Sequence, residues 1–79
     1  MSGEQLNVAF GVVLRRLREA RGLSQEELAH DAQTGQPYIS LLEAGKHSPS
    51  LATMDLVADA LGVALVDLIE AVEKERRSR

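Results

Sequence analysis

The feature that most limits what this chain can fold into is its segment from Ser24 to Gly45, SQEELAHDAQTGQPYISLLEAG. Ser24 and Glu27 have the S-x-x-E spacing of a capping box, which begins a helix by satisfying backbone N–H groups. Gln33-Thr34-Gly35 interrupts the helical pattern, and Pro37 follows where a first helical turn needs no N–H donor. Gly45 is suited to end the second helix. The segment therefore predicts two short helices joined by a tight turn.

Apolar residues at helical spacing predict another helix before this segment. It begins near Gly3, where Ser2 and Gln5 can form a second capping box, and it ends at Gly22. Two valines, Val8 and Val12, lie off its apolar stripe. The stripe consists of Leu6, Phe10, Val13, Leu14 and Leu17.

Two more helices are predicted after Gly45. Ser50 caps a fourth helix over 51–62, whose inner face comprises Met54, Val57, Ala58 and Leu61. A fifth helix covers about 64–74, and the polar tail 75–79 is expected to fray. Because no strand pattern, repeat or linker is present, residues 1–79 are predicted to form one all-α domain, a compact five-helix bundle.

Composition excludes several classes of protein. The 79 residues include no cysteine, so disulfides and thiolate metal sites are excluded. The N-terminus has no signal-peptide pattern, and no apolar run reaches the 18 residues of a membrane span, so we expect a cytoplasmic protein that contacts no membrane. No glycine-rich phosphate loop, metal-ligand cluster or nucleophile–base pair is evident. We therefore expect no enzyme activity, no cofactor and no metal.

The charge distribution leaves two interpretations open. The net charge is −3, although most small nucleic-acid-binding modules are basic. Either the positive charges gather on one face that attracts phosphates, or the chain is an ordinary acidic domain with solvated charges. The positive groups are Arg15, Arg16, Arg18 and Arg21, then Lys46 and His47, and finally Arg76, Arg77 and Arg79.

Several sequence pieces together resemble the Cro/phage-repressor-type helix-turn-helix proteins, the XRE family. They are RGLSQEELA at 21–29, YIS at 38–40, LExG at 42–45, PSL at 49–51 and ALGV at 60–63. The resemblance covers roughly residues 10 to 70, and in size and layout it is greatest to restriction–modification controller proteins. It implies a lambda-repressor-like domain that binds a double-stranded DNA operator as a homodimer through the major groove.

The second helix of the motif is the predicted recognition helix. If Ile39 and Leu42 face inward, Pro37 points outward, with Ser40 and Leu41 on either side. The resemblance implies base contacts from four positions of that helix and a possible contact from the turn before it. These residues are Gln36, Pro37, Ser40 and Leu41, with Thr34 in the turn. The sequence departs from the family pattern at Gln33, Thr34, Pro37 and Leu41.

Phosphate contacts require donors around the recognition helix. Gln25 lies at a helix start, where backbone N–H groups and the helix dipole favour an anion. For Tyr38, packing in the core is an equal alternative, and His47 is also compatible with a simple exposed loop position. The predicted phosphate contacts are Gln25, Tyr38, Lys46, His47 and Ser48.

The resemblance implies that Arg18 pairs with Glu43. Such a pair would join the first helix to the end of the recognition helix. Removing one partner of a half-buried pair leaves the other charge stranded. We therefore interpret Arg18 and Glu43 as a structural ion pair first, with a phosphate contact by Arg18 as the alternative.

The last two helices carry more apolar side chains than a small core requires. We predict a symmetric homodimer around the fifth helix, as in controller proteins. The alternative is that these residues are core or scattered exposed apolar side chains. The predicted interface residues are Leu56, Leu65, Val66, Ile69 and Val72.

Two functional hypotheses follow. The first is a sequence-specific DNA-binding transcriptional regulator. The second is a protein-interaction module of the same fold, such as an antitoxin or anti-repressor, which the acidic charge and the outward Leu41 and Leu56 favour.

Overall fold

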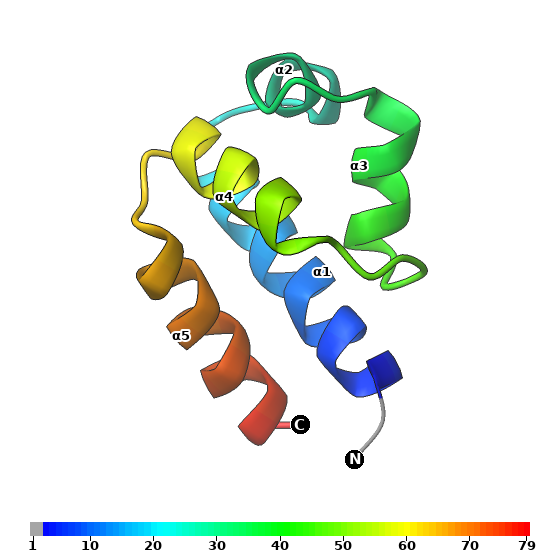
Figure 1. The fold of residues 1–79 in the computed structure, drawn as a ribbon, viewed down its shortest axis with the longest axis vertical. Helices are drawn as coiled ribbons and strands as arrows, with labels where there is room; N and C mark the ends of the chain where they lie inside the picture. The colour runs from blue at the N-terminus through cyan, green and yellow to red at the C-terminus, as the bar shows by residue number, and fades with distance from the viewer. Residues whose placement is uncertain (1–2) are drawn as a thin grey trace.

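The protein folds as five α-helices, described over residues 3–79 by a computed structural model (Figure 1). The helices are α1 (Gly3–Ala20), α2 (Gln25–Asp31), α3 (Gln36–Glu43), α4 (Leu51–Ala60) and α5 (Leu65–Arg77). Residues 3–79 contain no strand, so the predicted all-α class is confirmed. The predicted contribution of Ser2 to a capping box falls outside the described residues.

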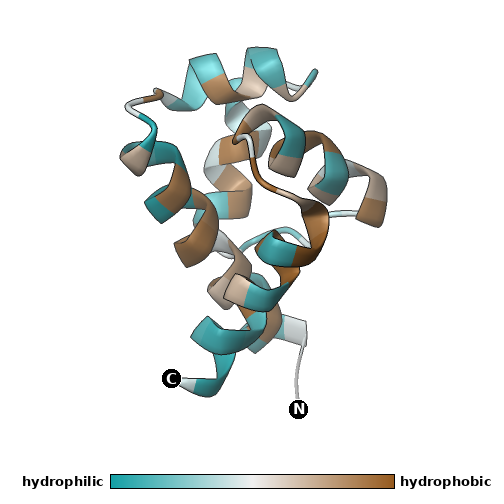
Figure 2. Ribbon diagram, turned by 90° about the vertical axis from the view of Figure 1, so that its left-hand side faces the viewer, coloured by the Kyte–Doolittle hydropathy of each residue, from teal (hydrophilic) through white to brown (hydrophobic). Residues whose placement is uncertain are grey.

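Helix α1 is the central element of the bundle. It packs against α3 on one side and α5 on the other, while α2 lies above them and α4 crosses in front (Figure 1). Each helix is banded in apolar and polar residues, which is expected where one side is buried (Figure 2). The aliphatic core is completed by Phe10 and comprises, among others, Val13, Leu14, Leu28, Ile39, Leu42, Val57, Leu61 and Leu68.

The predicted start of α2 is present in full. The Ser24 hydroxyl accepts a hydrogen bond from the Glu27 N–H at 3.0 Å, and the Glu27 carboxylate accepts one from the Ser24 N–H at 2.8 Å. The hydrogen bond that the Glu27 carboxylate accepts from the Ser24 N–H is the main cause that lowers the pKa of Glu27. After α2, Gln33 has a φ of 61°, the left-handed region that glycine adopts without steric cost. The turn therefore keeps its geometry although a glutamine stands where the family commonly has glycine.

The contact between α1 and α3 depends on Gly11. A Cβ atom at this position would lie 2.5 Å from the Leu42 carbonyl oxygen and 2.6 Å from the Glu43 carbonyl oxygen. Both of these atoms are backbone, so they cannot move aside without displacing α3. A residue without a side chain is therefore required for α3 to lie this close to α1.

Two details of the predicted helices are wrong, one about a buried face and one about a helix end. Leu6 is 43% exposed, because it lies in the first turn of α1, at the rim of the bundle. The tail does not fray from residue 75, since α5 continues to Arg77. Ion pairs hold this last part of α5: Glu75 binds Arg16 of α1 at 3.0 Å and Arg79 at 3.2 Å, and Glu73 binds Arg77 at 2.9 Å.

Candidate nucleic-acid interface

The outward face of α3 carries the predicted base-contacting residues. Ile39 and Leu42 are fully buried, which fixes the rotation of the helix about its own axis. Pro37 and Leu41 are consequently exposed, while Gln36 and Ser40 are partly exposed. Thr34 is partly exposed in the turn before α3, where its N–H donates to the Ala29 carbonyl at 2.8 Å. All five predicted residues therefore lie on or beside one solvent-facing strip.

A nearly buried ion pair stands behind this face. The Arg18 guanidinium donates to both carboxylate oxygens of Glu43, at 2.6 and 3.0 Å, and to the Leu23 carbonyl at 2.8 Å. The two charged side chains are 11% and 5% exposed. The hydrogen bond to Glu43 raises the pKa of Arg18. Arg18 and Glu43 thus form the predicted structural ion pair.

The ion pair continues into a chain of side-chain amides. The Gln25 Nε2 donates to the Glu43 carboxylate at 3.0 Å, and the Gln36 Nε2 donates to the Gln25 Oε1 at 2.7 Å. The first turns of α2 and α3 therefore touch through their glutamines. Sequence reasoning placed Gln25 only as a phosphate contact and missed this link. The available signal was the position of both glutamines in the first turn of adjacent helices.

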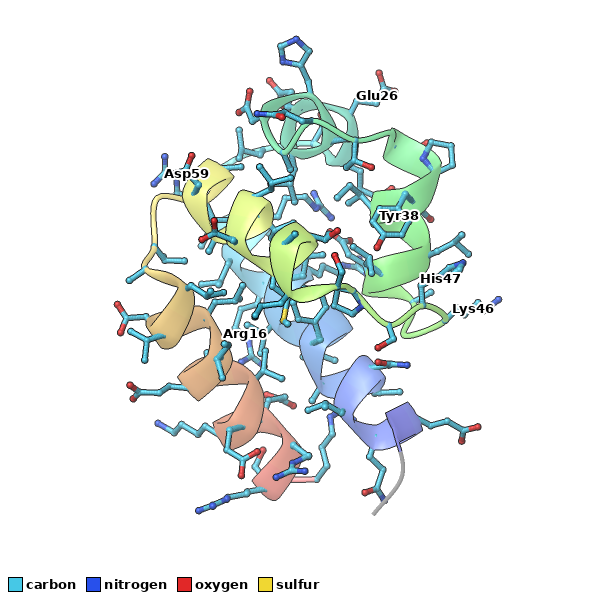
Figure 3. The ribbon with its side chains drawn as sticks, viewed as in Figure 1. Arg16, Glu26, Tyr38, Lys46, His47 and Asp59 are labelled. Atoms are coloured by element: carbon cyan, nitrogen blue, oxygen red, sulfur yellow. The ribbon has the colours of Figure 1, made fainter. Side chains whose placement is uncertain are left out.

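The four arginines in and just after the end of α1 do not form a free positive face. Arg15 pairs with Glu19 at 3.3 Å, and Arg16 pairs with Glu75 on the α5 side of the molecule (Figure 3). The Arg21 guanidinium donates to the Leu61 carbonyl at 3.0 Å. Together with Arg18, all four arginines of this cluster are engaged within the protein. Any positive charge presented beside α3 must therefore come from elsewhere.

The loop after α3 supplies that charge. Lys46 and His47 are exposed and lie beside α3, on the same side of the molecule as Tyr38 (Figure 3). Among residues 3–79, no hydrogen bond or ion pair is found for the Lys46 side chain. Tyr38 packs partly against the core, and its ring centre is 5.9 Å from that of His47. Ser48 is exposed in the same loop.

The predicted dimer residues are not equally accessible. Val66 is 61% exposed, Ile69 is 42% exposed and Leu56 is 36% exposed. Leu65 is partly buried. Val72 is only 7% exposed, because it belongs to the core of its own chain and is therefore unavailable to a partner. The exposed apolar surface of the last two helices is thus smaller than the sequence stripe predicts.

Other kinds of site are not evident in the described part of the chain. Within residues 3–79, no three His, Asp or Glu side chains lie close enough together to hold a metal ion. None of the helices described there combines the length and the apolar character needed to cross a bilayer.

Comparison with known proteins places the chain among helix-turn-helix regulators. It is 45% identical over 60 residues to the HTH-type transcriptional regulator DdrOP3 of Deinococcus deserti, a match that covers 76% of this chain and 46% of that protein. This chain thus spans about half the length of that relative. It is 35% identical over 71 residues to the control protein C.MunI of a Mycoplasma species, covering 89% of this chain and 96% of that protein.

Solved structures agree with these relatives. The restriction–modification controller protein C.AhdI of Aeromonas hydrophila superposes with a TM-score of 0.82 at 35% identity, covering 86% of this chain and 99% of that one. The controller protein C.Esp1396I, solved as a tetramer with its natural 35-base-pair operator, superposes with a TM-score of 0.82 at 27% identity, covering 90% of this chain and 93% of that one. Residues 14–68 match the helix-turn-helix family itself. The chain therefore belongs to the helix-turn-helix family of the XRE type.

Proposed function

We propose that this protein is a transcriptional regulator that binds operator DNA with α3 in the major groove. The observation that carries the proposal is the strip of Gln36, Pro37, Ser40 and Leu41, which faces solvent while Ile39 and Leu42 anchor the same helix. Glutamine, serine and apolar side chains can each contact base edges in the major groove. The operator complex of the similar C.Esp1396I supports this use of the fold. The proposed localisation of this regulator is the cytoplasm, where it would meet its operator DNA.

Phosphate contacts in this proposal come mainly from the loop after α3. Lys46, His47 and Ser48 flank the recognition helix, and the ring of Tyr38, a residue of that helix, lies 5.9 Å from the ring of His47. The side chain of Gln25 is held by Glu43 and Gln36, but its Nε2 has a second N–H that can donate to a phosphate.

Selection of duplexes from a random DNA library, followed by gel shift, tests the proposal. We expect the wild-type protein to enrich one sequence. The variants Gln36→Ala and Ser40→Ala should each bind that sequence more weakly by about 1–3 kcal/mol, with an unchanged circular dichroism spectrum. The control is Glu26→Ala, an exposed residue of α2 with no part in the strip. Failure to enrich any sequence would refute the proposal and favour the protein-interaction module.

We further propose that the regulator is a homodimer. Val66 and Ile69 of α5 and Leu56 of α4 are exposed apolar residues. Ile69 also lines a cavity of about 190 Å³ together with Leu6 and Phe10. A two-fold axis at this surface would let each copy cover the other's apolar side chains. Two recognition helices would then meet two half-sites about 34–36 Å apart.

Sedimentation at micromolar concentration tests the dimer. We expect the wild-type protein to sediment as a dimer and the Val66→Glu and Ile69→Glu variants to sediment as monomers, because each introduces a charge that two copies would bury. His30→Glu, at an exposed side chain of α2 outside the proposed dimer surface, provides a matched control. A wild-type monomer, or a dimer that both variants retain, would place the interface elsewhere.

A further inference from the structure

We propose that Glu43 is a specificity-determining positioning residue, whose carboxylate fixes the hydrogen-bonding edge that Gln36 turns toward DNA. Glu43 itself is nearly buried and lies behind the recognition face. The inference rests on the proposed function, because it concerns how the base-reading face of α3 is prepared. It assigns Glu43 a role beyond stabilising Arg18.

The argument begins with the chemistry of the carboxylate. An ionised carboxylate accepts hydrogen bonds and donates none. Both oxygens of Glu43 accept hydrogen bonds from the guanidinium of Arg18, at 2.6 and 3.0 Å. The part of Gln25 that faces Glu43 must therefore be its NH₂ group, and the two are 3.0 Å apart. The opposite orientation would bring two acceptor oxygens together.

The orientation of Gln25 then fixes that of Gln36. With its NH₂ group held by Glu43, Gln25 presents its carbonyl oxygen to Gln36. A carbonyl oxygen also only accepts, so Gln36 must present its own NH₂ group, which it does at 2.7 Å. Each amide alone has two orientations, but the carboxylate at the start of the chain leaves one arrangement for the pair.

This arrangement determines what Gln36 offers to a base. One N–H is bound to Gln25, so the second N–H and the Oε1 remain available. Adenine presents a matching acceptor, N7, and donor, N6–H, in the major groove. Guanine presents two acceptors there, N7 and O6, and one of them would oppose the Oε1 of Gln36. The fixed edge thus favours adenine over guanine.

Three variants separate this role from simple stabilisation. Glu43→Gln replaces an obligate acceptor with a group that can also donate, so both amide orientations become possible. Gln25→Met breaks the chain of amides but leaves the Arg18–Glu43 pair intact. Arg18→Lys is the control, because it loses the bidentate contact and the bond to Leu23 while the Glu43 carboxylate remains.

The first measurement needs no DNA. In the wild-type protein, the NMR spectrum should contain one set of side-chain NH₂ signals for Gln36, with one proton shifted by its hydrogen bond to Gln25. In Glu43→Gln these signals should double or average, because both orientations are populated. In Arg18→Lys they should remain as in the wild type. Unchanged Gln36 signals in Glu43→Gln would overturn the proposal.

The second measurement uses the DNA sequence that the wild-type protein selects. The base pair read by Gln36 is the one at which Gln36→Ala loses its preference. There, the wild type should prefer adenine over guanine on the order of tenfold. The preference should fall below about threefold in Glu43→Gln and Gln25→Met and persist in Arg18→Lys, although the last protein melts at a lower temperature.

The two measurements fail in distinguishable ways. Wild-type base preference in both Glu43→Gln and Gln25→Met would overturn the role of Glu43 while leaving operator binding intact. A wild-type protein that selects no DNA would refute the proposed function, and the NMR signals of Gln36 would then decide alone whether Glu43 orients the two amides.

Discussion

Replacing Arg18 with alanine should destabilise the fold strongly. The substitution removes two hydrogen bonds to Glu43 and one to the Leu23 carbonyl, and it leaves a carboxylate that is only 5% exposed without its cation. Breaking a buried ion pair by removing one partner costs about 3–5 kcal/mol. The bond from Gln25 remains and compensates only part of this loss.

The expected change in melting temperature follows from the size of the chain. A domain of 79 residues has an entropy of unfolding of about 0.17 kcal/mol/K. The melting temperature of Arg18→Ala should therefore fall by about 18–30 °C. Thermal unfolding followed by circular dichroism at neutral pH measures this shift.

Arg15→Ala provides the matched control on the same helix. Arg15 pairs with Glu19, but both side chains are more than half exposed, so its loss should cost about 0.5 kcal/mol or less and shift the melting temperature by about 3 °C at most. An Arg18→Ala protein that melts like Arg15→Ala would refute the reasoning. If it also failed to bind DNA, Arg18 would be a contact residue.

Three further predictions concern charge, backbone and pH. Lys46→Ala should weaken binding to all DNA sequences similarly and, in a dimer, reduce the slope of log K against log salt by about two units; changed specificity with an unchanged slope would contradict a phosphate role. Gln33→Gly should raise the free energy of unfolding by about 0.5–1 kcal/mol, because φ is 61° at that residue, whereas a lower melting temperature would show that the glutamine side chain compensates. The pKa of Glu27 is lowered in the folded state, so the contribution of its carboxylate to the stability of the fold should be complete above the ordinary glutamate pKa and lost as the pH falls through the lowered value. The difference in melting temperature between wild type and Glu27→Gln should therefore close in acid. Glu26→Gln, which alters no capping hydrogen bond, serves as the control, and a gap that persists unchanged in acid would argue against a role for the Glu27 charge.

Local signals were sufficient to predict most of the fold. The capping box at Ser24, the caps and glycines that bound the other helices, and the apolar stripes located all five helices. The end of α5 was missed because polar composition suggested fraying, whereas ion pairs of Glu73 and Glu75 extend the helix. Leu6 and Val72 were misplaced because periodicity identifies an apolar face but does not show which neighbour covers it.

The site was harder to predict than the fold because it depends on how helices meet. The outward residues of α3 followed from placing Ile39 and Leu42 inside. The engagement of Arg16, Arg18 and Arg21 did not follow, because their acceptors lie on other helices or loops. The contact between Gln25 and Gln36 requires the relative position of α2 and α3, which no pattern in a single helix contains.

The absent side chain at Gly11 has a consequence for how this protein can be redesigned. The inner side of α3 admits almost no variation, because a single methyl group at residue 11 would meet two carbonyl oxygens of that helix. Pro37 and Leu41 lie on the opposite side of α3, where they are exposed and no such steric limit applies. Substituting them changes the exposed surface of α3 without changing how the helix packs against α1. The outer residues of α3 can therefore be varied while the packing of the helix against α1 stays the same.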